Sequence, residues 1–385
     1  MTAQNTPELL DAVIIGGGPV GLFLGCCLAA RGLRFAVLER DLAPRPHSRS
    51  IGIHPPLLER FAALGMAQAL LSQGVKVPRG AVFVGGKWLG ELSFEDVSRD
   101  FGFILLLPQH RTEAILEARL HQLQPGALRR GARVVEVRDS GRGVEVTYER
   151  EGGRQTLTAH FAVGADGKRS FARSAAGISY QGGPYPDSYL MGDFADTTAY
   201  GPTAVIHLSK GGVVESFPLP GGLRRWVVRT DRLEHGATPR ALCALIRART
   251  NLRVPPDSCA MLSAFGVERH LAARFVKGHT VLIGDAAHEV SPIGGQGMNL
   301  GWLDAAALAG VLEQVARGEV AAHRALRAFE RRRRVSARIA ARQAEFNMAF
   351  GRPWRASRAR VALTRALLGA PLRFVLTRLF TMRWL

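Results

Sequence analysis

Three glycines and one glutamate near the start of the chain have the spacing of a turn that binds a dinucleotide. Gly16, Gly18 and Gly21 fill the pattern G-x-G-x-x-G, and Glu39 follows them. The first glycine permits a tight turn, the second lets the backbone approach a pyrophosphate, and the third lets a helix pack closely, so that free N–H groups at the helix start can bind the anion. The glutamate is placed to accept hydrogen bonds from ribose hydroxyls. These residues predict a bound dinucleotide and leave open whether it is FAD or NAD.

The segments around these residues have the patterns needed to hold them in place. Residues 12–15 form an apolar run typical of a buried strand, a helical pattern follows and ends near Gly32, and residues 34–38 form a second strand that leads into Glu39. Glycines also occur in ordinary turns, but this order of strand, glycine turn, helix, strand and acid is that of a complete βαβ unit.

Two further motifs that combine glycine and aspartate occur later in the chain. Gly164-Ala165-Asp166-Gly167 follows a strand-like run, and Gly284-Asp285 follows the apolar run 281–283. The glycine-rich stretch 294–297 then leads into a helical pattern that continues through Leu308. Each motif alone is a common turn, and only their occurrence together, in this order, indicates one shared site.

With these three motifs the sequence resembles the FAD-dependent aromatic monooxygenases of the p-hydroxybenzoate hydroxylase type. These are the group A flavoprotein hydroxylases, which include hydroxylases of ubiquinone biosynthesis and of polyketides. The resemblance covers about residues 11–335. It implies an α/β fold in which a Rossmann-type FAD-binding domain, of the GR2 type, is interleaved with a smaller antiparallel β-sheet substrate domain and is followed by a helical C-terminus.

The resemblance also implies where the domains lie. We expect the FAD-binding domain at residues 8–72, 109–178 and 270–350, and the substrate domain at residues 73–108 and 179–269. Residues 351–385 are expected to form a basic amphipathic helical tail.

Site residues follow from the resemblance, residue by residue. Cofactor-binding roles are expected for Gly16, Gly18, Pro19, Val20, Gly21, Glu39, Arg40, Arg49, Arg111, Asp166, Gly167, Gly284, Asp285, Pro292, Gly295, Gly297, Met298 and Asn299. The helix start at residues 294–299 would direct backbone N–H groups at the flavin N1–C2=O edge and stabilise the anion of the reduced ring. Catalytic roles are expected for Pro292, Gly294 and Gly295, which would lie beside a flavin C4a-hydroperoxide and exclude water from it.

The implied chemistry uses FAD as cofactor, NADPH or NADH as electron donor, and O2. The expected reaction is hydroxylation or epoxidation of an apolar, aromatic or quinone-like small molecule. Phe217, Trp226 and Phe265 are candidates for lining the substrate site, and His207 is a weaker candidate for a general base.

Two other functions remain open. One is an FAD-dependent reductase of an isoprenoid or polyene chain that inserts no oxygen. The other is a membrane-associated or nucleic-acid-associated binding protein that keeps FAD only for its structure. No second complete dinucleotide fingerprint occurs in the sequence, which argues against flavoproteins of the disulfide-reductase type.

Positive charge is concentrated at the end of the chain. The 385 residues carry 51 basic and 32 acidic side chains, a net charge of +19, and the segment from Arg331 to Leu385 holds 14 arginines against one acid, Glu345. Its apolar side could pack on the FAD domain, or the tail could lie on an anionic membrane surface. Binding to nucleic acid is the least favoured alternative, because no recognition module accompanies the basic residues.

The remaining composition indicates neither a metal site nor a secreted protein. The four cysteines have neither metal-ligand spacing nor the pattern of a disulfide framework: Cys26, Cys27, Cys243 and Cys259. We recognise no signal peptide and no uninterrupted apolar stretch of the roughly 20 residues that a spanning helix needs. We therefore expect a cytoplasmic protein without a metal, with peripheral contact at the inner face of the membrane as an alternative for the tail.

Overall fold

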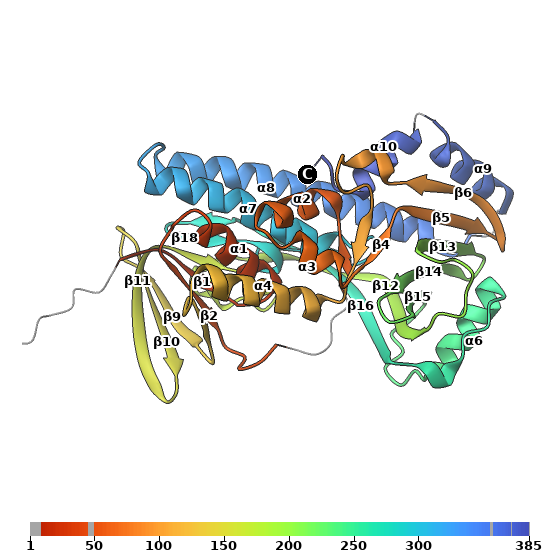
Figure 1. Cartoon of the computed structure of the whole chain (residues 1–385), viewed down its shortest axis with the longest axis horizontal. Coiled ribbons are helices and arrows are strands. Elements are labelled where there is room, and N and C mark those ends of the chain that lie inside the picture. The colour runs from red at the N-terminus through yellow and green to blue at the C-terminus, as the bar shows by residue number, and fades with distance from the viewer. Residues whose placement is uncertain (1–8, 45–49, 355–356, 371, 385) are drawn as a thin grey trace, which may run out of the picture.

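Two eight-stranded β-sheets, built from chain segments that alternate along the sequence, organise the molecule (Figure 1). The structure is a computed structural model that describes residues 9–44, 50–354, 357–370 and 372–384. The first sheet has the order β17-β18-β11-β1-β2-β8, with β10 and β9 continuing from β11. Its strands are β1 (Leu10–Ile15), β2 (Phe35–Glu39), β8 (Leu128–Arg130), β9 (Arg133–Asp139), β10 (Val144–Arg150), β11 (Gly153–Gly164), β17 (Val276–Lys277) and β18 (Thr280–Leu282).

The centre of the first sheet is parallel, and its strands are buried. β1 pairs in parallel with both β2 and β11, and β11 pairs in parallel with β18. Strands of this kind read as continuous apolar runs because both faces of the sheet are covered. Helix α1 (Pro19–Ala29) packs between α4 (Gln109–Leu123) and α7 (Gln296–Ala316), and α7 packs on α8 (Ala322–Gly351). The predicted βαβ unit is therefore present.

The second sheet is antiparallel except for one parallel pair, β13 with β5. Its order is β19-β16-β12-β15-β14-β13-β5-β6. Its strands are β5 (Arg79–Val84), β6 (Lys87–Ser93), β12 (Tyr180–Ala195), β13 (Thr203–Ser209), β14 (Gly212–Leu219), β15 (Leu223–Thr230), β16 (Met261–Ala272) and β19 (His288–Glu289).

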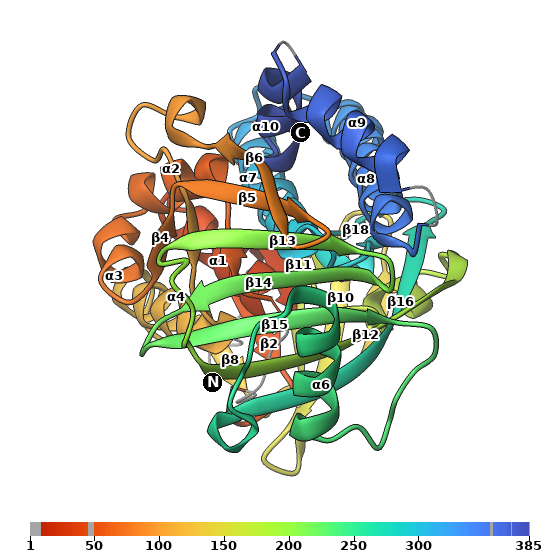
Figure 2. The same cartoon turned by 90° about the vertical axis from the view of Figure 1, so that its right-hand side faces the viewer.

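The two faces of the second sheet have different neighbours. Helix α6 (Pro239–Thr250) lies across one face (Figure 2), where Trp226 packs with residues of that helix. Because side chains alternate along a strand, Phe217 and Phe265 lie on the opposite face, which borders a cavity. The expectation that Trp226 lines the substrate site is therefore wrong. His207 does not border this cavity either; its ring stacks on Phe83 and contacts the hydroxyl of Tyr200, so the general-base hypothesis fails for it.

Smaller elements connect the sheets. A three-stranded sheet has the order β3-β7-β4, with β3 (Gly52–Ile53), β7 (Ile104–Leu106) and β4 (Val75–Val77). The short helices are α2 (Pro55–Ala63), α3 (Ala67–Leu71) and α5 (Phe171–Ala175). All four cysteines are free, and burial raises the pKa of Cys26 and of Cys27 to about 12.

The C-terminal tail is helical, and it packs on the body of the protein. Helices α9 (Ser357–Leu368) and α10 (Leu372–Phe380) lie beside strand β6 (Figure 2). Thr364, Thr381 and Met382 are buried in these contacts, and Arg383 forms an ion pair with Glu59 of α2. None of the helices among the described residues combines the length and the apolar character needed to cross a membrane.

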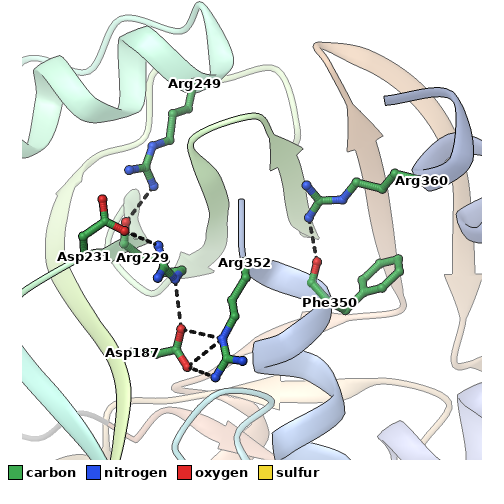
Figure 3. Close-up of polar contacts among 7 residues, drawn as sticks. All are labelled: Asp187, Arg229, Asp231, Arg249, Phe350, Arg352 and Arg360. Atoms are coloured by element: carbon green, nitrogen blue, oxygen red, sulfur yellow. Dashed lines mark hydrogen bonds and ion pairs between the residues drawn. The ribbon is translucent and has the colours of Figure 1, made fainter. Parts of the chain in front are cut away.

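A cluster of charged residues fixes the end of α8 to the second sheet (Figure 3). Asp187 of β12 accepts hydrogen bonds from Arg229 Nε at 2.9 Å and from Arg352 Nη2 at 2.7 Å. Arg229 also pairs with Asp231, and Arg360 donates to the backbone carbonyl of Phe350 at 2.6 Å. Several tail arginines thus have structural partners rather than a purely solvated role.

The predicted fold class is confirmed: a Rossmann-type sheet and an antiparallel sheet are interleaved, and the C-terminus is helical. The exact limits of the two domains stay a prediction.

Candidate active site

The glycine turn and the two glycine–aspartate motifs meet around one cavity of about 1000 Å³. The turn after β1, the end of β2 and the loop after β11 all contribute to its wall. Eight of the predicted site residues line it: Gly16, Gly18, Pro19, Glu39, Arg40, Asp166, Gly167 and Asp285. The carboxyl ends of neighbouring parallel strands bring these residues together, which is where open α/β sheets bind their ligands.

Backbone geometry explains the three glycines of the first motif. Gly16 has φ +107°, and a Cβ atom there would lie 2.5 Å from the carbonyl oxygen of Ala165. A Cβ atom at Gly21 would lie 1.9 Å from the carbonyl oxygen of Gly16. A Cβ atom at Gly18, in contrast, would have no other atom within 4 Å, because this residue faces the cavity. Two of the glycines are thus required by the turn itself, whereas Gly18 leaves room for a ligand.

This difference predicts separate effects for two alanine substitutions. We expect Gly21→Ala to destabilise the protein by about 1–3 kcal/mol, because the turn must move to accept the methyl group. Gly18→Ala should leave the free energy of unfolding of the apoprotein nearly unchanged and weaken FAD binding at least about tenfold, since its methyl group enters the cavity. Urea unfolding of both apoproteins and fluorescence titration with FAD measure the two effects. A Gly18→Ala apoprotein as unstable as Gly21→Ala would contradict this division of roles.

Two carboxylates in this cavity suit a cofactor with hydroxyl groups. Glu39 Oε2 accepts a hydrogen bond from Gly17 N–H at 2.6 Å, so its carboxylate lies against the glycine turn. Asp166 Oδ2 accepts a hydrogen bond from the N–H of Ala172 at 3.1 Å and so holds the start of α5. Asp166 Oδ1 is buried and has no hydrogen-bond partner among the described residues. A buried acceptor without a hydrogen bond is energetically costly, and a bound ligand can supply the missing hydrogen-bond donor.

A second cavity of about 960 Å³ lies between the two sheets and adjoins the first. The two share five lining residues: Pro19, Gln109, Ala165, Gly167 and Asp285. Most of the second wall is apolar, with Met191, Ile206, Phe217 and Phe265 from the antiparallel sheet. The opposite wall carries further predicted residues: Val20, Pro292, Gly294, Gly295, Gly297 and Met298.

A glycine turn at the start of α7 forms this opposite wall. Gly294 and Gly295 have φ values of +95° and +68°, which favour glycine. Asn299 does not line the cavity; its side chain donates to the carbonyls of Gly52 and Gly295 and accepts from the N–H of His54. Asn299 therefore holds the turn against the β3 segment.

His54 connects this turn to the tail. The side chain is buried, and burial lowers the pKa of His54 to about 4, even though the backbone carbonyls of Phe380 and Gly295 act in the opposite direction. The imidazole is thus neutral near pH 7. Phe380, the last residue of α10, also lines the second cavity. Neither residue is part of a sequence motif that predicts a place in the site.

The Gly284-Asp285 motif has a charged network behind it. Asp304 of α7 is fully buried and accepts from Gly284 N–H at 3.1 Å, from His288 Nε2 at 2.5 Å and from Arg333 Nε at 2.6 Å. Burial alone would raise the pKa of Asp304, but His288 and Arg333 hold it below its usual value. The side chain of Asp285 lines both cavities and is therefore exposed to the space inside them. It nevertheless lies deep in the molecule, and desolvation there raises the pKa of Asp285 to about 6.

Arg173 joins the second motif to the third. Its guanidinium donates to the carbonyl of Lys168 at 2.7 Å and to that of Ala286 at 3.0 Å. It also lies over the ring of Tyr180, whose hydroxyl donates to the Asp285 carbonyl. The relative position of the two glycine–aspartate motifs is therefore fixed by one buried cation, which no local sequence pattern indicates.

Some of the predicted residues lie elsewhere. Arg111 is exposed on α4 and lines neither cavity, whereas Gln109 at the start of that helix lines both. Gly21 and Gly284 do not line the cavities and act through packing. Arg49 lies outside the described residues.

One group of side chains has the composition of a metal site. Glu268, His270 and Glu289 bring their ligand atoms within 4.8 Å of one another. Lys168 Nζ lies 3.6 Å from Glu268 and 3.4 Å from Glu289, so a cation already balances the two carboxylates. We assign no metal to this cluster.

The two adjoining cavities fit FAD. The glycine turn and Glu39 suit the adenosine and pyrophosphate, the unpaired oxygen of Asp166 can accept a hydrogen bond, and the apolar cavity has room for a ring system and a substrate.

Comparisons with known proteins agree with this assignment. The family model "FAD binding domain" matches residues 10–344. The uncharacterised aromatic compound monooxygenase YhjG of Bacillus subtilis is 35% identical over 320 residues, which cover 78% of this chain and 62% of that protein. The 6-methylpretetramide 4-monooxygenase of Streptomyces rimosus is 33% identical over 320 residues, covering 80% of this chain and 56% of that protein.

The fold also has a close structural counterpart. The crystal structure of p-nitrophenol 4-monooxygenase from Pseudomonas putida superposes with a TM-score of 0.87 at 24% identity, covering 97% of this chain and 98% of that chain. The chain spans only 62% and 56% of the length of the two curated relatives above. The family match, which covers most of the chain, shows that this chain, whose cofactor is FAD, belongs to the FAD binding domain family.

Proposed function

We propose that the protein is an FAD-dependent monooxygenase that uses NADPH or NADH and O2 to hydroxylate an apolar aromatic molecule, or to epoxidise a quinone-like one. The observation that carries the proposal is the junction of the two cavities at Asp285: one is lined by groups that suit a dinucleotide, and the other is mainly apolar. FAD, when bound, supplies hydride acceptance and oxygen activation, which side chains do not provide.

The residues of the first cavity are proposed to bind the cofactor. The backbone N–H groups of Gly18 and Val20, at the start of α1, face the pyrophosphate, and Pro19 between them contributes only its ring because it has no N–H group. Glu39 accepts hydrogen bonds from the ribose. We propose that Gln109, which lines both cavities, takes the place of the predicted Arg111.

The turn before α7 is proposed to form the catalytic wall. Pro292, Gly294 and Gly295 border the apolar cavity, and the start of α7 presents backbone N–H groups there. The partial positive charge at a helix start stabilises a neighbouring anion. Ile293 and Phe380 cover the same wall with apolar surface and so restrict the entry of water.

Oxygen consumption tests this function. The holoenzyme is supplied with NADPH or NADH, and O2 uptake is followed with and without each member of a panel of aromatic and quinone-like compounds. We expect at least one compound to increase uptake and to yield product that carries one added oxygen. Oxygen-independent saturation of a double bond would instead support a reductase, and failure of both nucleotides to reduce the flavin would indicate a structural flavin.

We also propose that the protein is cytoplasmic and makes peripheral contact with an anionic membrane through α10. The outer side of the helix exposes Leu372, Phe374 and Val375, with the cation of Arg378 over the ring of Phe374. Apolar side chains next to arginine suit an interface with acidic headgroups.

Sedimentation with vesicles tests the membrane contact without removing the helix, whose inner side belongs to the cavity wall. We expect the wild type to pellet with phosphatidylglycerol vesicles and the double variant Phe374→Ser, Val375→Ser to remain in solution. The matched control is Val335→Ser, Ile339→Ser, which removes exposed apolar side chains from α8. Equal sedimentation of all three proteins would rule out contact through α10.

A further inference from the structure

One acidic side chain in the apolar cavity has no partner. Glu215 lies on β14 and lines the second cavity, and only 8% of its surface is exposed. Among the residues that the structure describes, no hydrogen bond or ion pair engages its carboxyl group. A buried carboxyl group is costly without a hydrogen-bond partner, so this one requires a donor from the cavity.

The neighbours of Glu215 on the sheet cannot supply that donor. In the strand register Glu215 lies opposite Ile206 on one side and Val227 on the other, and both are apolar residues that line the cavity. Two cations of β15 lie on this face, two residues to either side of Val227. Arg225 forms a bidentate pair with Asp193 at 2.7 and 2.8 Å, and Arg229 is paired with Asp187 and Asp231.

Other titratable groups also lie near this face of the sheet. The hydroxyl of Tyr189 is buried without a hydrogen-bond partner in the described part of the chain, and the Glu215 charge contributes to raising the pKa of that tyrosine. Beyond Tyr189 lies the Asp187, Arg229 and Arg352 cluster, whose charges are paired with one another. Across the cavity, His54 and Asp285 are the titratable groups among the described residues that line it.

We propose that Glu215 binds the hydroxyl group of an aromatic substrate and takes its proton, so that the preferred substrate class is a phenol. In this step the O–H bond of the phenol breaks, the electron pair stays on the phenolate oxygen, and the proton forms a bond to a Glu215 carboxylate oxygen. The proposal rests on the proposed function. A phenolate ring is richer in electrons than the neutral phenol, and it therefore reacts more readily with the electrophilic oxygen that a monooxygenase supplies.

The environment matches this role. Burial raises the pKa of Glu215 to about 7. At neutral pH its side chain is therefore present both as the carboxylate and as the carboxylic acid, as a general base requires. As a base it must be ionised, so proton removal from the phenol should increase as the pH rises through about 7 and be suppressed below it.

Binding of 4-nitrophenol to the oxidised holoenzyme tests the proposal without turnover, since its ionisation is visible in its absorbance. We expect the wild type to bind it as the phenolate above about pH 7, and Glu215→Gln to bind it un-ionised and roughly 10-fold to 100-fold more weakly. The ligand control is 4-nitroanisole, which has no proton to lose and should show no such pH dependence. The protein control is Glu91→Gln, the same change on β6 of the same sheet at an exposed ion pair with Arg79.

The possible outcomes test separately the identity of the base, the substrate class and the monooxygenase function. Ionisation of bound 4-nitrophenol by Glu215→Gln at the same pH as in the wild type overturns the assignment of the base. Failure of 4-nitrophenol, 2-naphthol and catechol to perturb the flavin spectrum of the wild type overturns the substrate class. If the ionisation depends on Glu215 but no phenol increases O2 uptake, the proposed monooxygenase function fails while the binding role of Glu215 stands.

Discussion

Replacing Asp304 by asparagine is expected to destabilise the protein by about 3–5 kcal/mol. The carboxylate is fully buried and balances the cation of Arg333, and it also holds His288 and the N–H of Gly284. An amide cannot neutralise a buried guanidinium, so the charge of Arg333 would be left uncompensated. Because Gly284 precedes Asp285, FAD binding should weaken as well. Urea unfolding of the apoprotein and flavin release from the holoenzyme measure these effects.

The pH dependence gives this prediction a second check. Since the pKa of Asp304 is lowered in the folded protein, its contribution to stability is complete above its ordinary value of 3.8 and is lost as the pH falls through the lower folded-state value. The stability difference between the wild type and Asp304→Asn should therefore be constant near neutral pH and shrink in strong acid. Glu313→Gln, on the same helix, removes surface ion pairs with Arg31 and Arg317 and should cost only about 0–1 kcal/mol. Equal losses for the two variants would show that Asp304 contributes no more than a surface charge.

Replacing Asp187 by asparagine is expected to cost about 3 kcal/mol, near the lower end of the range for a broken buried ion pair. Asp187 is fully buried between Arg229 and Arg352, but Arg352 is partly exposed and water can solvate it once the carboxylate is gone (Figure 3). The loss should be accompanied by faster amide exchange in α9 and α10, because Arg352 ends α8 and leads into the tail.

A matched control exists on the same arginine. Asp231 also pairs with Arg229, at 2.8 Å, yet its side chain is 88% exposed. Asp231→Asn removes the same charge from the same partner at the surface and should change the free energy of unfolding by about 0–1 kcal/mol. Comparable losses for Asp187→Asn and Asp231→Asn, measured by urea unfolding, would mean that burial of the pair is unimportant.

Much of the FAD-binding half could be predicted because its signals are local. The apolar run of β1, the glycine turn and the strand that ends at Glu39 are continuous in sequence and form one unit in space. The Gly284-Asp285 and Asp166-Gly167 motifs could be added because each follows a buried strand of the same sheet. Their meeting at one cavity follows from parallel strand order.

The substrate side was less predictable because the relevant information is not local. Alternation along β15 shows that Arg225 and Trp226 lie on opposite faces, but only the position of α6 decides which face borders the cavity. Similarly, Gln109 and Arg111 lie on different sides of α4, and the helical pattern alone did not show which side faces the cofactor.

Two further features had weak sequence signals. Glu215 stands alone in the apolar strand Gly212–Leu219, and an acid in such a strand could have marked it as a functional candidate. The amphipathic pattern of the tail predicted helices, but nothing in it showed that Phe380 would reach the cavity.

The position of Phe380 has a consequence for how the protein is made. The glycine turn at Gly16 and the end of α10 border two adjoining cavities, although nearly the whole chain separates them. During synthesis on the ribosome, the FAD-binding sheet cannot be completed before β18 has been made. The cavity wall cannot be completed until Phe380 has left the exit tunnel. A nascent chain therefore cannot be protected by substrate while it folds, and its many contacts between distant segments predict slow folding. The yield of folded protein should thus depend strongly on temperature and on chaperones.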